Sequence, residues 1–164
     1  MTRQPIIQVA RTGYEFLAAG ASRLQPVFLL VVRLYWGWQF FQSGKGKLGD
    51  ISKVVGFFTD LGIPFPTINA YMAGMTECFG GLLLLLGVAS RLTTIPLIIT
   101  MIVAYVTAEN AALKSVFTDP DKFTGATPFL FLMAAVIVFI FGPGVFSVDA
   151  LFNRIIDWRQ KKEP

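Results

Sequence analysis

Histidine is absent from this chain of 164 residues, and cysteine occurs only once, as Cys78. A single thiol cannot form an internal disulfide or a CxxC redox centre. Without histidine the chain alone cannot build a bis-histidine haem site or a tetrahedral zinc site with nitrogen and sulfur ligands. We therefore expect no intrinsic metal, no catalytic residue and no self-sufficient redox enzyme. Whether the chain serves an oxidoreductase as one of its subunits stays open.

Charged residues are also scarce, making up 15% of the chain against about 25% in a typical soluble domain. The shortfall is concentrated in four apolar stretches, each of roughly the 20 residues that a helix needs to cross a bilayer. Such a pattern is typical of an all-α, polytopic membrane four-helix bundle, since only helices satisfy every backbone group within one segment. The predicted spans are residues 26–43, 67–89, 92–108 and 128–146.

Shorter segments flank this predicted domain of residues 25–149. Residues 1–24 carry an apolar stripe among charges and predict a helix lying on the membrane surface, and Pro26 suits the first turn of the span that follows. Apolar positions after Asp50 predict a second interfacial helix with Asp50 as its N-cap. Residues 150–164 predict a basic amphipathic helix on the inner leaflet.

The basic residues predict the orientation in the membrane. Eight lie in the two tails and the second loop: Arg3, Arg11, Arg23, Arg91, Arg154, Arg159, Lys161 and Lys162. Five lie in the other two loops: Lys45, Lys47, Lys53, Lys114 and Lys122. The positive-inside rule therefore places both termini in the cytoplasm. No aromatic stacking platform accompanies these residues, so we expect the bilayer and not nucleic acid as the partner.

Arg33 and Glu77 are the only charged residues deep within the first two predicted spans. Each lies about ten residues from the loop that joins these spans, so both are about 15 Å from the same membrane face. Since an unpaired charge at that depth is costly, we predict that the two side chains meet. Such a pair either holds the helices in register or lines a cavity for a polar or quinone-like headgroup.

Further polar and small residues are predicted to line the same cavity. Small residues beside Glu77 let helix backbones approach closely, or leave room for a ligand. The candidates for the lining are Gly37, Gln39, Gln42, Lys47, Tyr71, Gly74, Gly81, Thr100 and Tyr105.

Four motifs in order, between Arg33 and Asp149, resemble the DoxX family of small bacterial membrane proteins with four helices. They are Phe-Gln-Ser-Gly-Lys-Gly-Lys-Leu at 41–48, Gly-Ile-Pro at 62–64, Glu-Cys-Phe-Gly-Gly with its leucine run at 77–87, and Gly-Pro-Gly-Val-Phe-Ser-Val-Asp at 142–149. Ser43 stands where many family members have histidine, so no role of that histidine is carried over.

The resemblance implies an inner-membrane component linked to redox metabolism, related to the membrane subunits of thiosulfate:quinone oxidoreductase. Three functions remain open on this basis. The first is a subunit that binds a quinone or a similar lipid-soluble ligand for a partner redox subunit. The second is a carrier of a small solute or protons, which would need a homo-oligomer because four helices are few for a transporter. The third is a non-catalytic scaffold or assembly factor.

Overall fold

A computed structural model describes residues 4–160, with side chains described at 8, 9 and 11–160, and every regular element in this part of the chain is a helix. The all-α prediction is therefore confirmed. The residues at the two ends of the predicted tail segments, 1–3 and 161–164, lie outside the described part. The helices are α1 (Gln4–Gly49), α2 (Ile51–Asp60), α3 (Pro66–Leu86), α4 (Ser90–Thr107), α5 (Asn110–Lys114), α6 (Pro120–Gly125), α7 (Pro128–Phe141) and α8 (Val148–Gln160).

Three of these helices, α1, α3 and α4, are long and apolar enough to cross a membrane. They cover three of the four predicted spans. The fourth apolar helix, α7, has 14 residues and therefore rises about 21 Å. It stops at Phe141 and not at 146, because Gly142 adopts a φ of 79° and turns the chain away.

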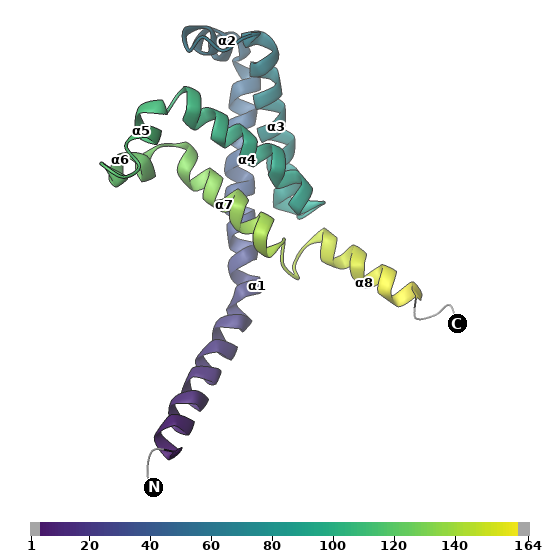
Figure 1. Ribbon diagram of the computed structural model, residues 1–164. Helices are drawn as coiled ribbons and strands as arrows, with labels where there is room; N and C mark the ends of the chain where they lie inside the picture. Colours follow the sequence, from purple (N-terminus) through teal and green to yellow (C-terminus); the bar gives the residue numbers. More distant parts are fainter. Residues whose placement is uncertain (1–3, 161–164) are drawn as a thin grey trace.

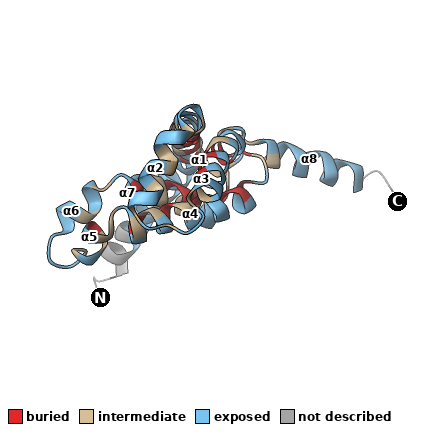
Figure 2. Cartoon of the chain, turned by 90° about the horizontal axis from the view of Figure 1, so that it is seen from above, coloured by how far each residue is buried: buried red, intermediate tan, exposed pale blue. Residues whose placement is uncertain are grey.

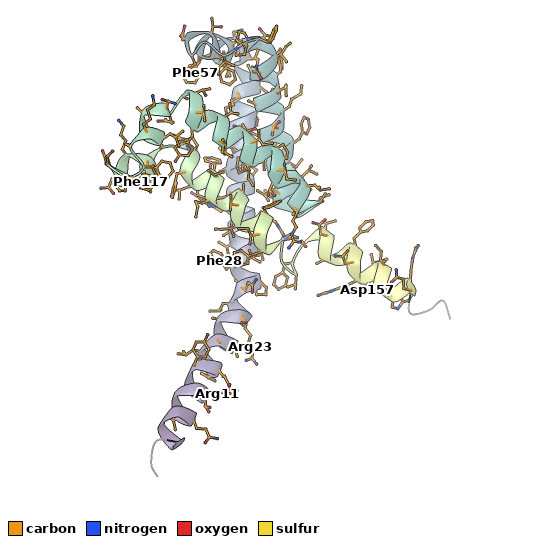
Figure 3. The ribbon with its side chains drawn as sticks, viewed as in Figure 1. Arg11, Arg23, Phe28, Phe57, Phe117 and Asp157 are labelled. Atoms are coloured by element: carbon orange, nitrogen blue, oxygen red, sulfur yellow. The ribbon has the colours of Figure 1, made fainter. Side chains whose placement is uncertain are left out.

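The first helix is much longer than the sequence predicts. Residues 4–49 form one helix of 46 residues, which rises about 69 Å and includes Pro26 in its interior. The expectation that Pro26 opens a new helix is thus wrong. Proline removes one backbone donor and commonly kinks a helix, and the axis changes direction between the labelled Arg23 and Phe28 (Figure 3). The helix also continues past Ser43, where the first span was predicted to end, through the Gly-Lys-Gly-Lys segment at 44–47.

The core lies where α1, α3, α4 and α7 meet. α1 and α3 run side by side over most of α3, and α4 and α7 cross them as a second pair (Figure 1). Viewed from above, the buried residues gather along these crossings, whereas α8 is exposed (Figure 2). The buried cluster consists of Phe40, Leu84, Leu97, Met101, Ala135 and Val138. Large apolar side chains on the outer surfaces of these helices remain exposed, as expected of a protein surrounded by lipid.

Glycines allow α1 and α3 to approach closely. A Cβ atom built on Gly37 would lie 2.7 Å from the backbone nitrogen of Leu85, and one built on Gly44 would lie 2.6 Å from the Cα of Cys78. Both distances are far below the ordinary contact distance of about 3.5 Å. Only glycine fits at these two points.

The shorter helices lie at the ends of the bundle. The predicted helix after Asp50 is confirmed as α2, and the carboxylate of Asp50 accepts a hydrogen bond from the backbone N–H of Lys53 at 3.3 Å. α2 packs on α3. At the other end of the bundle α8 projects outward with its apolar residues exposed (Figure 1).

Candidate functional site

Arg33 and Glu77 do not meet, and the predicted pair is wrong. Both side chains are buried, with 2% and 1% of their residue surfaces exposed. Each, however, has other partners: Arg33 binds backbone carbonyl groups, and Glu77 binds Ser43 and Lys47. The two charges therefore occupy two separate sites.

The register of α1 against α3 explains the error. Gly37 lies opposite Leu85, and Gly44 lies opposite Cys78. Continuing this register puts Glu77 level with a point on α1 about twelve residues beyond Arg33, so the two charges differ in depth by about 18 Å. The predicted depths were wrong because the first helix was expected to end at Ser43. α1 instead continues to Gly49, and the start of α3, at Pro66, lies beyond that end of α1.

The guanidinium group of Arg33 joins three parts of the chain. Its Nε donates to the carbonyl oxygen of Leu85 at 3.3 Å, and its Nη1 donates to that of Pro143 at 2.7 Å. Its Nη2 donates to the carbonyl oxygen of Phe146. A guanidinium has five N–H donors in a fixed plane, which suits this use. Arg33 thus fastens the end of α3 and the loop after α7 to α1, which is a structural role.

Asp149 completes this junction. Its carboxylate accepts hydrogen bonds from the backbone N–H groups of Ala89, at 2.7 Å, and Ser90, at 2.9 Å. These donors belong to the first turn of α4, where a negative charge is favourable. Its own backbone N–H donates to the carbonyl oxygen of Gly87 at 3.0 Å. The segment 142–149 therefore connects the start of α8 to the turn between α3 and α4 by these hydrogen bonds.

Glu77 belongs to a different group of polar residues, inside the bundle. One carboxylate oxygen accepts a hydrogen bond of 2.7 Å from the hydroxyl of Ser43, and the other forms an ion pair with the ammonium of Lys47. Ser43 and Lys47 are one helical turn apart on α1, so both reach the same point of α3. The Glu77 side chain is 1% exposed, whereas that of Lys47 is 30% exposed. The pair therefore runs from the interior toward a surface.

A cavity of about 420 Å³ adjoins this pair and lies between the end of α1, α2, the first half of α3 and α4. Among the described residues that line it, Lys47 and Glu77 are the only charged ones. Neutral polar groups come from Asn69, Thr76, Thr100 and Thr107. The remaining wall is apolar and consists of Phe57, Phe58, Leu61, Ile63, Met72, Ala73, Pro96, Ile99, Val103, Ala104 and Ala108. Ligand sites are commonly mostly apolar cavities of this kind with a few converging polar groups.

Of the predicted lining residues, Lys47 and Thr100 line this cavity together with Glu77. The predicted glycines lie instead at close helix contacts: Gly37 and Gly81 between α1 and α3, and Gly74 against Leu48. Four other predicted residues are not part of the cavity wall: Gln39, Gln42, Tyr71 and Tyr105. The hydroxyl of Tyr105 donates to the carbonyl oxygen of Phe123 at 2.8 Å and so connects α4 to α6.

The sequence interpretation missed the contribution of α2. Phe57, Phe58 and Leu61 form one wall of the cavity, although the sequence assigned their helix to the membrane surface alone. The spacing of these residues gives α2 an apolar face. That face could have been interpreted as one that packs against the spanning helices and not against lipid. Ser43 was also set aside because it replaces a histidine of the family, yet its hydroxyl holds Glu77.

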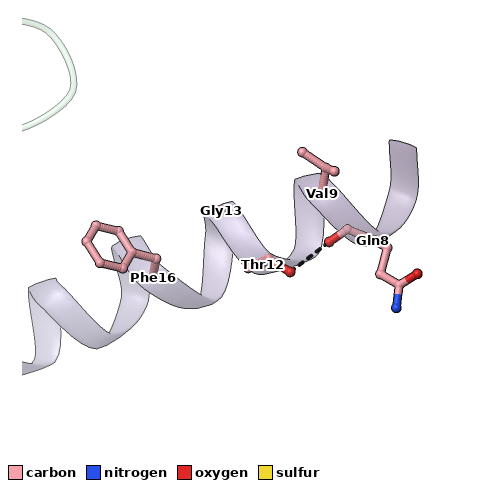
Figure 4. Close-up of a pocket in the computed structure, with 5 residues that line it drawn as sticks. All are labelled: Gln8, Val9, Thr12, Gly13 and Phe16. Atoms are coloured by element: carbon pink, nitrogen blue, oxygen red, sulfur yellow. Dashed lines mark hydrogen bonds between the residues drawn. The ribbon is translucent and has the colours of Figure 1, made fainter. Parts of the chain in front are cut away.

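A second hollow lies along the free part of α1. It is lined by Gln8, Val9, Thr12, Gly13 and Phe16, and the hydroxyl of Thr12 donates to the carbonyl oxygen of Gln8 at 3.0 Å (Figure 4). All five residues come from one helix, so no groups converge on the space from opposite sides. We do not regard it as a binding site.

Comparison with known proteins gives a consistent answer. Residues 28–110 match the DoxX family model. An uncharacterized membrane protein of Mycobacterium tuberculosis is 30% identical over 136 residues, which are 79% of this chain and 83% of that protein. A Bacillus subtilis protein named "Putative oxidoreductase CatD" is 27% identical over 120 residues, covering 73% of this chain and 83% of that protein.

An uncharacterized protein of Haemophilus influenzae is 26% identical over 137 residues, which are 79% of this chain and 85% of that protein. No solved structure matches the chain at a comparable level. The matched segment begins before Arg33 and extends past α4, so it includes Ser43, Lys47 and Glu77. This membrane protein is a member of the DoxX family.

Proposed function

We propose that this protein is a bacterial inner-membrane subunit that binds a lipid-soluble ligand with a polar headgroup for a partner redox enzyme. The ligand class that we propose is a quinone, and the site is the cavity beside Glu77 and Lys47. The observation that carries the proposal is a mostly apolar cavity of about 420 Å³ whose wall contains an ion pair between the buried Glu77 and the partly exposed Lys47. Arg33 has no part in this site.

The composition of the cavity wall suits such a ligand. Two aromatic rings, Phe57 and Phe58, offer flat apolar surfaces to a ring system. Lys47 offers an ammonium group with three donors, of which Glu77 uses one. A carbonyl oxygen of a ring-shaped headgroup can accept one of the others, while its hydrocarbon tail remains in the membrane.

The redox assignment has a separate basis. The Bacillus subtilis relative carries the name of an oxidoreductase. This chain has no histidine and one cysteine, so the groups that usually hold redox centres must come from elsewhere. We therefore propose that a partner subunit supplies or accepts the electrons.

We also propose that α7 completes a bundle of four spans and that both termini are cytoplasmic. In Figure 1 the N-terminal part of α1, the turn between α3 and α4, and α8 all lie toward one end of the molecule. The arginines of these segments are the basis of the predicted orientation. Lys47 no longer argues against it, since its charge is paired with Glu77 inside the bundle.

Equilibrium binding of a short-chain quinone to the purified protein in nanodiscs tests the proposed site. The variants Glu77→Gln and Lys47→Met are expected to weaken binding, because each removes one half of the pair beside the headgroup. Glu15→Gln and Lys45→Met are matched controls, since both residues are exposed on α1 away from the cavity. Folded Glu77→Gln and Lys47→Met proteins that bind as tightly as wild type would contradict the site.

A further inference from the structure

We infer that Glu77 determines the charge of the ligand: by neutralising Lys47 it makes the cavity a site for uncharged, carbonyl-bearing amphiphiles and excludes anionic ones. This inference rests on the proposed function and adds the chemical class that the site selects. It assigns separate roles to the two residues. Lys47 donates to the ligand, and Glu77 keeps Lys47 from attracting a carboxylate or another anion.

The charge balance of the cavity is the first argument. In the part of the chain that the structure describes, Lys47 and Glu77 alone of the lining residues are charged, and they are in contact with each other. Their charges cancel within the wall. A neutral headgroup therefore meets a polar wall without net charge, whereas an anionic headgroup would be drawn to Lys47 and repelled by the carboxylate of Glu77 directly behind it. In a low-dielectric site such repulsion is poorly screened.

The hydrogen bonds of the neutral polar residues are the second argument. The hydroxyl of Thr100 donates to the carbonyl oxygen of Pro96 at 2.9 Å, and that of Thr107 donates to the carbonyl oxygen of Val103 at 2.7 Å. The side-chain amide of Asn69 donates to a backbone carbonyl at 2.7 Å. The hydroxyls of Thr100 and Thr107 and one N–H of Asn69 are thus already in use. The other neutral donors of the wall, the hydroxyl of Thr76 and the second N–H of Asn69, carry no charge. The ammonium of Lys47 is therefore the strongest donor that faces the cavity. It selects an acceptor such as a carbonyl oxygen.

The position of Glu77 is the third argument. Its side chain is almost fully buried and is held on one oxygen by Ser43 and on the other by Lys47. Lys47 is the outer member of the pair, with a 30% exposed side chain. A ligand therefore reaches the ammonium before the carboxylate. Glu77 acts on the ligand through Lys47, as a residue that sets specificity and not as a catalytic one.

A matched pair of probes tests the inference. One probe is a neutral alkylnaphthoquinone, and the other is its hydroxylated analogue, which is an anion at neutral pH. Both are titrated into the full-length protein in nanodiscs of neutral lipid, and the ratio of the two dissociation constants is measured. Wild type is expected to prefer the neutral probe by about tenfold or more.

Each variant is expected to change the ratio of the two dissociation constants in its own direction. Glu77→Gln leaves Lys47 unpaired and should reverse the preference in favour of the anion. Lys47→Gln leaves Glu77 without its ion-pair partner. It should weaken binding of the neutral probe and abolish binding of the anion. The double variant Lys47→Gln/Glu77→Gln restores a neutral wall and should again prefer the neutral probe, although it binds more weakly than wild type. Thermal unfolding shows which variants are folded.

Three results overturn the inference. If wild type binds the neutral probe and folded Glu77→Gln keeps the wild-type ratio, the specificity role is wrong while the proposed binding site stands. If wild type binds neither probe, the proposed function fails and the inference fails with it. Should Glu77→Gln not fold, the comparison of Lys47→Gln with the double variant decides, because an unchanged ratio between those two also refutes a role for the carboxylate.

Discussion

The contact between α1 and α3 at Gly44 gives the sharpest prediction of stability. A Cβ atom on Gly44 would lie 2.6 Å from the Cα of Cys78 and 2.7 Å from the carbonyl oxygen of Gly74. Both neighbours are backbone atoms and cannot rotate away. The substitution Gly44→Ala therefore has to push the two helices apart by about 1 Å to restore ordinary contact distances.

The expected cost follows from this geometry. Forcing one extra methyl group into a packed interface costs typically 1–3 kcal/mol, and a backbone neighbour points to the upper end, about 3 kcal/mol. Alanine is the better helix former by about 1 kcal/mol, which offsets part of this cost. Gly44→Ala should therefore lower the free energy of unfolding by about 2 kcal/mol. It should also weaken ligand binding, since Ser43 and Lys47 flank the displaced point of α1.

Gly46→Ala is the matched control. It lies two residues along the same helix, and a Cβ atom there meets nothing within 4 Å. This variant gains the helix propensity without the collision, so it should be as stable as wild type or more stable by up to about 1 kcal/mol. Equilibrium unfolding in mixed micelles, followed by circular dichroism, measures both. Equal stability of the two variants would refute the close packing of α1 on α3.

Three further predictions concern the Arg33 junction and the orientation. Arg33→Leu should destabilise the fold by about 3 kcal/mol in unfolding assays, because it removes three hydrogen bonds from a buried charged donor. The same result for Arg33→Lys would fit the need for a planar fork, and a changed quinone affinity in a folded variant would argue against separate sites. Asp149→Asn should cost about 1 kcal/mol and speed amide exchange at the start of α4; unchanged exchange would contradict the cap. In a Cys78→Ala background, cysteines replacing Lys53 and Arg154 should react with an impermeant maleimide from opposite membrane faces, and labelling from one face would refute the proposed topology.

Parts of the fold could be predicted because they depend on local properties. Apolar runs of membrane-spanning length identified α1, α3 and α4, and Asp50 marked the start of α2. The bounds were less accurate. The first span was predicted to end at Ser43, but the helix continues to Gly49, because its packing against α3 outweighs the weak helix propensity of the glycines.

The candidate site depended on the register between helices, which the sequence does not contain. From the sequence we predicted that Arg33 and Glu77 are both buried and have partners, because a charged side chain in the middle of an apolar span is costly wherever it faces lipid. Which partners they find was decided by the tertiary structure. Close glycine contacts set α1 against α3 at a register that brings Ser43 and Lys47 to Glu77, and leaves Arg33 at the carbonyl groups of the loops.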